Sequence, residues 1–150
     1  LQLNKSFYFL SESVKEAVGE IQHNKADCIF KIDVKNEAII DADRVRIDQV
    51  IMNLLSNAVK YSESERIVRI EIESDHKGTK CAVIDQGIGI PKELQPYVFD
   101  RFFRVHASSQ LFSGLGLGLF ISSEIIKQHG GSIGVESEEG KGSCFWFILP

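Results

Sequence analysis

The 150-residue sequence has few cysteines and no long apolar run. Cys28, Cys81 and Cys144 are widely spaced, so they match neither a zinc-binding spacing nor a disulfide framework, and we expect buried, reduced thiols. No apolar run reaches the roughly 18–20 residues that cross a bilayer, and no secretory signal peptide is visible. We therefore expect a cytoplasmic domain without direct membrane contact. The chain starts without methionine and looks like a piece of a longer parent, which could carry a membrane anchor elsewhere.

The sequence also lacks an excess of positive charge. Its formal net charge is -4 and it contains no basic run, which argues against a nucleic-acid surface. A bound anion would therefore need a local site. The length fits one domain over residues 1–150, and there are no repeats, low-complexity tracts or internal linkers.

Hydrophobic periodicity predicts an α+β fold. Helical spacing covers residues 11–23 and 44–61, with Ser11 and Asp43 as N-caps, and a third helix follows residues 114–119 and ends at a glycine pair. Alternating, β-branched runs predict strands over residues 28–34, 38–40, 67–73, 80–85, 132–137 and 144–149. We expect a two-layer α/β sandwich, in which about three helices cover one face of a mostly antiparallel mixed sheet.

The remaining segments are predicted to be irregular. Residues 1–9 form an extended, aromatic lead-in, residues 75–78 a hairpin turn, and residues 105–113 a mobile loop with sparse apolar anchoring. Pro91 and Pro96 bracket a very short helix at most. The four histidines have no metal-binding or catalytic-triad pattern, so we predict ordinary surface residues for His23, His76, His106 and His129.

Two asparagines interrupt the helical pattern of residues 44–61. Asn is a poor helix former because its amide competes with the backbone for hydrogen bonds. At about 100° per residue, Asn53, Asn57 and Lys60 fall within roughly 60° on one side of the helix. Amide oxygens can ligate Mg²⁺, and the ammonium can bind a phosphate. The alternatives are a polar pair that caps neighbouring loops and a surface lysine with its charge in water.

A first glycine cluster, Gly114, Gly116 and Gly118, runs directly into a helix. Backbone amides and the helix dipole at such a place favour a bound anion. The segment is not a P-loop, and the nearest match, Gly140-Lys141, is followed by another glycine where Ser or Thr is required. It is not a dinucleotide fingerprint either, because Leu119 stands in place of the third glycine. The alternative is a plain loop.

A second cluster follows Asp85, at the end of a predicted strand, with Gly87 and Gly89. A partly buried carboxylate there could accept a hydrogen bond from an exocyclic amine while the backbone closes on a flat base. The alternative is an Asp-Gly turn. Arg101 and Arg104 could reach a terminal phosphate, or could pack with solvated guanidinium groups, among the aromatic side chains of Phe99, Phe102 and Phe103.

Five motifs occur in one order along the chain: Asn-x-x-x-Asn-Ala-x-Lys-Tyr, Asp-x-Gly-x-Gly-Ile, Phe-Asp-Arg-Phe-Phe-Arg, Gly-x-Gly-Leu-Gly-Leu and Gly-x-Gly-Ser-x-Phe. This order resembles the catalytic, ATP-binding domain of bacterial sensor histidine kinases, over nearly the whole chain. The resemblance implies the Bergerat-type α/β sandwich shared with gyrase-like and Hsp90-like ATPases. It also implies a mobile ATP lid, and ATP and Mg²⁺ as ligands.

At the base end, the resemblance implies that Asp85 reads the adenine. The rest of the loop and the last glycine motif, in which the family more often has Thr than Ser, would shape the pocket. These implied ATP-binding residues are Gly87, Gly89, Ile90 and Ser143.

At the phosphate end, the resemblance implies that Asn53 and Asn57 lie beside Mg²⁺. It implies that Lys60 contacts a phosphate and Tyr61 the nucleotide. The phenylalanine motif and the lid would supply further ATP contacts from Phe99, Phe102, Arg104, Gly114, Gly116, Leu117, Gly118 and Leu119. The implied catalytic residues are Asn53, Lys60 and Arg104.

The residue at position 53 bears on the reaction. Hydrolytic members of the superfamily carry a glutamate four residues before the second Asn of the helix motif, where it activates water. Here that position is Asn53, whose amide is not basic. The resemblance therefore implies phosphoryl transfer to a protein histidine, by positioning and electrostatics. The alternatives are an ATPase of the superfamily, a nucleotide-binding regulatory module without phosphotransfer, and a serine kinase of the anti-sigma-factor kind.

The phosphoacceptor is expected outside this chain. In the family it is a histidine followed by Glu or Asp in a preceding helical dimerisation domain, and no histidine here is followed by an acidic residue. Residues 1–9 would lead in from that domain. We expect a monomeric fragment, a homodimeric parent and a response regulator as the downstream partner.

Overall fold

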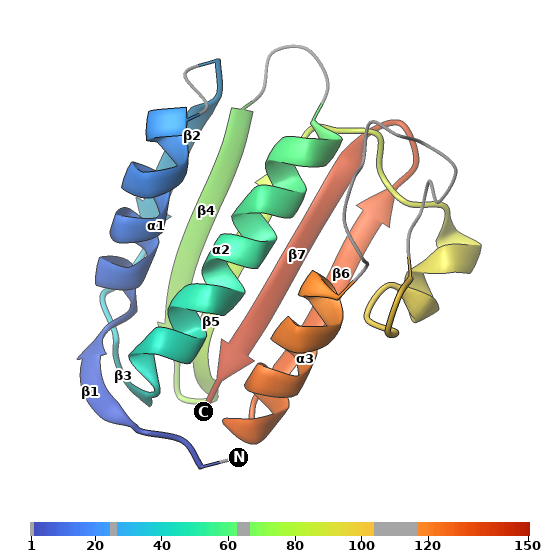
Figure 1. Cartoon of the computed structure of the whole chain (residues 1–150). Helices are drawn as coiled ribbons and strands as arrows, with labels where there is room; N and C mark the ends of the chain where they lie inside the picture. The colour runs from blue at the N-terminus through green and yellow to red at the C-terminus, as the bar shows by residue number, and fades with distance from the viewer. Residues whose placement is uncertain (1, 25–26, 63–66, 104–116) are drawn as a thin grey trace.

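The structure has two layers, helices on a sheet (Figure 1). The computed structural model describes residues 2–24, 27–62, 67–103 and 117–150. In this part of the chain three α-helices cover one face of a five-stranded sheet. They are α1 (Leu10–Asn24), α2 (Arg44–Tyr61) and α3 (Gly118–Gln128), and α2 lies between the other two. The predicted two-layer α+β sandwich is confirmed.

The main sheet is mixed and mostly antiparallel, as predicted. Its strand order is β2–β4–β5–β7–β6, and β2 and β4 are parallel while the other described neighbours are antiparallel. A separate antiparallel pair joins β1 to β3. The strands are β1 (Ser6–Phe9), β2 (Ile29–Val34), β3 (Ile39–Ala42), β4 (Ile67–Asp75), β5 (Gly78–Asp85), β6 (Ser132–Glu138) and β7 (Gly142–Leu149). Because β5 is central, a residue at its end has strands on both sides.

The core lies between the sheet and the inner faces of the helices. The buried residues of α2 recur at helical spacing, so its apolar stripe faces inward; they are Ile47, Val50, Ile51, Leu54, Leu55, Ala58 and Val59. Asp43 caps the helix as predicted, because its carboxylate accepts a hydrogen bond from the Arg46 N–H at 3.4 Å. The stripe leaves the predicted metal and phosphate residues of α2 outside the core.

Some local predictions are wrong in detail. Ser11 is not an N-cap, because α1 begins at Leu10 and the Ser11 hydroxyl instead donates to Glu37 Oε2 at 3.0 Å. Pro96 does not end the short helix after Pro91. It lies inside the 3₁₀ helix η1 (Lys92–Tyr97). The extended lead-in also has a role, since its residues Ser6–Phe9 pair with β3.

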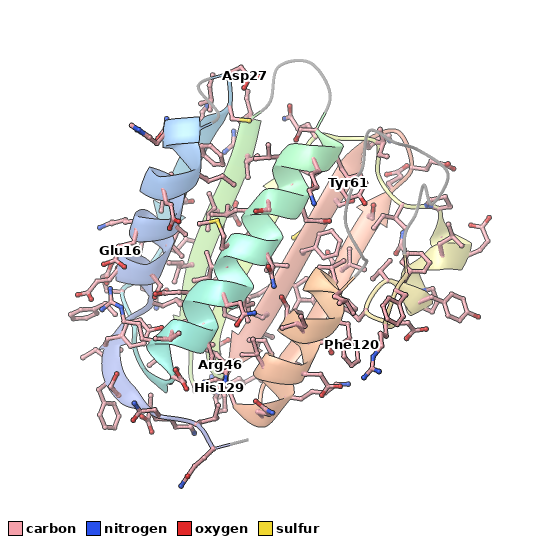
Figure 2. All side chains as sticks on the ribbon, in the orientation of Figure 1. Glu16, Asp27, Arg46, Tyr61, Phe120 and His129 are labelled. Carbon is pink, nitrogen blue, oxygen red and sulfur yellow. The ribbon has the colours of Figure 1, made fainter. Side chains whose placement is uncertain are left out.

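His129 is a buried residue and not the predicted surface histidine (Figure 2). Its Nε2 accepts a hydrogen bond from the Asp43 N–H at 3.0 Å, and its Nδ1 lies 2.8 Å from the Ile125 carbonyl oxygen. Since Nε2 accepts, we assign the proton to Nδ1, which donates to that carbonyl. The ring therefore joins the end of α3 to the start of α2, a contact that local sequence cannot reveal.

The other histidines and the cysteines largely follow expectation. His23 and His76 are exposed, and His106 lies outside the described residues. Two of the three reduced cysteines, Cys28 and Cys81, are buried, whereas Cys144 is only half-buried because it points to the face of the sheet without helices. None of the described helices combines the length and the apolar character needed to cross a membrane.

Candidate functional site

The predicted base-reading residue, Asp85, ends β5 and is 4% exposed. Its Oδ1 accepts hydrogen bonds from the Gly87 N–H at 2.9 Å and from the Ser143 N–H at 3.3 Å. Both bonds use Oδ1, so in the described part of the chain Oδ2 is left as an acceptor for a ligand. Burial raises the pKa of the Asp85 carboxyl, and the two N–H donors oppose that shift. The side chain is thus fixed in orientation, with one oxygen available.

The glycines after Asp85 allow a close approach of backbone to backbone. A Cβ at Gly87 would lie 2.0 Å from the Tyr61 carbonyl oxygen, and one at Gly89, where φ is +70°, would lie 2.2 Å from that of Glu138. Between them, Ile88 donates its N–H to Tyr61 at 3.2 Å. The loop therefore runs against the end of α2, where Figure 2 labels Tyr61, and against the turn between β6 and β7.

Two residues at this end of the site were not predicted, Ser137 and Gln95. Ser137 Oγ accepts from the Ile90 N–H at 2.8 Å, donates to the Gly142 carbonyl at 2.9 Å and lies 2.7 Å from Ser143 Oγ. Gln95 Nε2 donates to the carbonyls of Ile90 and Ser137 at 2.9 and 2.8 Å. A serine in a strand and a glutamine in a short helix form no motif. The β6–β7 register, which places Ser137 opposite Ser143, brings Ser137 to the loop, and η1 brings Gln95 to it.

The predicted metal and phosphate residues lie on α2 outside its buried stripe. Asn53 Nδ2 donates to the Gly118 carbonyl and to Ser122 Oγ, both at 3.2 Å, which leaves Oδ1 as its remaining polar atom. Asn57 is half-buried, and its side chain makes no hydrogen bond within the described residues. Lys60, one turn further on, is exposed. Asn53 therefore bridges two helices and can still offer an oxygen to a ligand.

These amide groups fit Mg²⁺ as part of a ligand set. Among the described residues there is no group of three or more His, Cys, Asp or Glu that could hold a metal ion. Mg²⁺ keeps several waters and usually takes further oxygens from substrate phosphates. Asn53 Oδ1 and the Asn57 amide oxygen could supply the protein share. Such a site would hold the metal together with a nucleotide, not the metal alone.

The start of α3 faces Asn53. Leu117 is the N-cap residue and supplies no side-chain cap, although its carbonyl accepts the Ile121 N–H at 2.8 Å. Backbone N–H groups at such an end favour an anion. A Cβ at Gly118 would meet Asn53 Cγ at an ordinary 3.7 Å, so packing does not require this glycine. Leu119 is half-buried against the core. Outside the described residues lie the predicted loop 105–113 and Arg104, Gly114 and Gly116.

The side chains of the phenylalanine motif lie partly in the core and partly at the surface. Phe99 meets Phe145 edge to face, with ring centroids 6.2 Å apart and planes at 83°. Phe102 is 62% exposed and has φ of +66°, which is unusual for a bulky residue. The Arg101 guanidinium lies 4.8 Å from the ring centre of Phe120 in α3, a residue labelled in Figure 2. Arg101 therefore packs on an aromatic ring, the second of the two interpretations that the sequence allowed.

The two-layer α/β sandwich is the fold of a family of ATPase-like domains. The model of the family of histidine kinase-, DNA gyrase B- and HSP90-like ATPases matches residues 42–150, and the chain belongs to this family. ArlS, a signal transduction histidine-protein kinase of Staphylococcus haemolyticus, is 32% identical over 142 residues, which are 93% of this chain and 31% of ArlS. WalK, a sensor histidine kinase of Bacillus subtilis, is 42% identical over 114 residues, 74% of this chain and 19% of WalK.

The same similarity is found among solved structures. The catalytic domain of histidine kinase ThkA matches with a TM-score of 0.85 and 31% identity, over 99% of this chain and 96% of that one. The resemblance inferred from the five motifs is thereby confirmed. The chain spans less than a third of the length of the two curated relatives, 31% of ArlS and 19% of WalK.

Proposed function

We propose that residues 1–150 form a catalytic domain that binds Mg-ATP at this site and transfers the γ-phosphoryl group to a histidine. The bond between the β- and γ-phosphates would break and a phosphorus–nitrogen bond would form, with ADP as the leaving group. The acceptor would lie in a separate helical dimerisation domain of a homodimeric parent, and this domain alone would be monomeric. A response regulator would then receive the phosphoryl group, in the cytoplasm.

One observation carries the proposal, the carboxylate of Asp85. Both of its hydrogen bonds to described residues use Oδ1, so Oδ2 can accept from a ligand amine. Adenine presents a donor amine at the position where guanine presents a carbonyl acceptor, and an unpaired acceptor facing another acceptor is unfavourable. Gly87 and Gly89 bring the backbone close enough to line a flat base. These features support ATP as the nucleotide.

At the other end of the site, the amide oxygens of Asn53 and Asn57 would hold Mg²⁺ with its nucleotide. When bound, Mg²⁺ would neutralise negative charge on the phosphates. Lys60 would contact a phosphate and Tyr61 the nucleotide. Arg104 would act as a further catalytic cation. The remaining ATP contacts are assigned to Ile90, Phe99, Phe102, Gly114, Gly116, Leu117, Gly118, Leu119 and Ser143.

Transfer is favoured over hydrolysis because the amide of Asn53 cannot take a proton from water. Two similar structures support the nucleotide and the partner. ShkA in complex with AMPPNP has a TM-score of 0.88 and 25% identity, over 100% of this chain and 32% of that one. ThkA in complex with response regulator TrrA has a TM-score of 0.80 and 30% identity, over 97% of this chain and 41% of that one.

The experiment is transfer from ATP labelled at the γ-phosphate. The domain is incubated with Mg²⁺ and labelled ATP, alone and with the separately produced dimerisation domain of its parent. We expect an acid-labile, base-stable label on the dimerisation domain and none on the catalytic domain, since the latter has no acceptor of the expected kind. Released phosphate is measured in parallel.

Each outcome separates the candidate functions. Label on the dimerisation domain that disappears when its acceptor histidine is replaced by alanine supports the histidine kinase. Rapid phosphate release without any labelled protein would instead favour the ATPase alternative. Stable phosphohistidine on the isolated catalytic domain would contradict the proposal that the acceptor lies elsewhere.

A further inference from the structure

The loop that would close on the base is anchored at two residues by different kinds of partner. Ile88 uses main-chain partners, since its N–H donates to the Tyr61 carbonyl at 3.2 Å and its carbonyl accepts from the Gly140 N–H at 2.7 Å. Ile90 uses side chains, since its N–H donates to Ser137 Oγ at 2.8 Å and its carbonyl accepts from Gln95 Nε2 at 2.9 Å. Substitutions can remove only the second pair of anchors.

We propose that Gln95 and Ser137 are positioning residues that set the shape and the base selectivity of the pocket. They act through Ile90 and Ser143 on Asp85 and on the loop that follows it, and touch none of the reacting atoms. This inference rests on the proposed ATP site and adds two residues that lie outside the five sequence motifs. Gln95 is the link between η1, the loop and β6.

The hydroxyl groups explain how Ser137 would affect selectivity. Ser137 has one proton, which it donates to the Gly142 carbonyl at 2.9 Å. Either hydroxyl could donate in the 2.7 Å contact between Ser137 and Ser143. Because the one proton of Ser137 is already donated to Gly142, we assign the donor role to Ser143. Ser143 Oγ is then left with lone pairs only, like Asp85 Oδ2. Two acceptors at one end of the pocket suit the donor amine of adenine and oppose the carbonyl of guanine.

The side-chain amide of Gln95 is needed as a double donor. Its two N–H groups point to two carbonyl oxygens, of Ile90 at 2.9 Å and of Ser137 at 2.8 Å. Leucine has a similar size and no donor. Glutamate has the same shape, but its ionised carboxylate would face two carbonyl oxygens with no proton to share. Both replacements should free the loop from η1, and Gln95→Glu should do so more than Gln95→Leu.

The test compares Mg-ATP with Mg-GTP by calorimetric titration of the whole chain, with thermal unfolding in parallel. For Gln95→Leu we expect the dissociation constant for ATP to rise about tenfold, because the two hydrogen bonds that tie Ile90 of the loop to Ser137 of β6 through Gln95 are lost. The preference for ATP over GTP should shrink by a similar factor, while the unfolding midpoint falls by only a few degrees. Ser137→Ala should behave alike. In the double variant the two losses should not multiply, because both residues hold the same loop.

The matched control is Gln22→Leu, the same change at an exposed glutamine of α1, which should leave both affinities unchanged. ATP binding within twofold of the original protein in both Gln95→Leu and Ser137→Ala would overturn the positioning role. Equal loss of ATP and GTP binding in step with lost stability would also overturn it, since that is the mark of a purely structural contact. If the unaltered protein bound neither nucleotide, the proposed ATP site itself would be wrong, and the roles of Gln95 and Ser137 would be wrong with it.

Discussion

The two ends of the candidate ATP site are built in different ways. At the base end, Asp85 is buried and the loop after it is pinned to α2 and to the β6–β7 turn by main-chain contacts. At the phosphate end, Asn57 and Lys60 lie on α2 outside its buried stripe, and Asn53 donates a hydrogen bond to α3. We infer that folding alone assembles the base end, whereas the phosphate end is completed by its ligand.

This difference explains why the glycines of the two ends must be interpreted differently. Gly87 and Gly89 are required by packing, because a side chain there would collide with a carbonyl oxygen at 2.0 or 2.2 Å. Gly118 has ordinary space for a Cβ. A glycine that packing does not require is better explained by a ligand. Gly118 is therefore stronger evidence for a binding site than Gly87 and Gly89, which packing alone explains.

The largest expected effect is that of Gly87→Ala. The new methyl group would lie against the Tyr61 carbonyl, so the loop must move away from α2, and we expect stability to fall by at least about 2 kcal/mol together with ATP binding. Gly118→Ala is the comparison: stability should stay level or rise, because Ala favours a helix, while ATP affinity falls. Urea unfolding and calorimetry measure both. A stable Gly87→Ala variant, or an unstable Gly118→Ala variant, would break the contrast.

The second effect concerns the pH dependence of stability in Asp85→Asn. The folded-state pKa of Asp85 is raised above its usual 3.8, so the stability that this carboxyl contributes is present below that value and lost as the pH rises through the folded-state pKa. Asparagine carries no such cost. The stability of the variant relative to the original protein should therefore be highest near neutral pH and fall toward pH 3.8. Denaturant unfolding at several pH values measures it, and the opposite trend would contradict the burial argument.

The third comparison is between Asn53→Ala and Asn57→Ala. Asn53 holds Gly118 and Ser122 of α3, so its loss should cost about 1 kcal/mol of stability. Asn57 has no described hydrogen bond, so its loss should stay within about 0.5 kcal/mol. Both variants should lose the part of ATP affinity that depends on Mg²⁺, measured by titration with and without the metal. Equal losses of stability in the two variants would contradict a stabilising role for the hydrogen bonds from Asn53 to α3.

The smallest expected effect is that of Lys60→Gln. Lys60 is exposed, so stability should change by no more than about 0.5 kcal/mol. ATP affinity should fall several-fold at low salt, and the difference should shrink as salt is added, because screening weakens exposed charge pairs. Titrations at two ionic strengths measure this. A large loss of stability would make Lys60 a structural residue, and an unchanged affinity would remove it from the phosphate end.

Contiguous patterns made much of the fold and part of the site predictable. A few neighbouring residues determine each of three features: the apolar spacing of α2, the cap at Asp43 and the strand that ends at Asp85. The packing of Gly87 and Gly89 is consistent with the motif that singled them out. The shared face of Asn53 and Asn57 follows from the sequence, because helical spacing alone places residues four apart on one side of a helix.

Contacts between distant segments could not be predicted in this way. Ser137 and Gln95 reach the loop through strand pairing and through η1, and neither belongs to a motif. His129 was expected at the surface because no motif includes it, whereas in the structure it is buried and bonded to Asp43, the N-cap of α2, 86 positions away. Ser11 was chosen as a cap by residue type, but the helix begins one residue earlier. Each miss reflects tertiary packing that overrides a local preference.

The most direct test of the central claim is a calorimetric titration of the original protein and of Asp85→Asn with Mg-ATP. The original protein should bind one ATP, and Asp85→Asn should show no measurable binding while it unfolds cooperatively at a similar temperature. The amide oxygen of asparagine can still accept the Gly87 N–H, so the fold should persist, whereas its NH₂ group would meet the donor amine of adenine. A folded Asp85→Asn variant that binds ATP with unchanged affinity would contradict the assignment of this end of the site to the base.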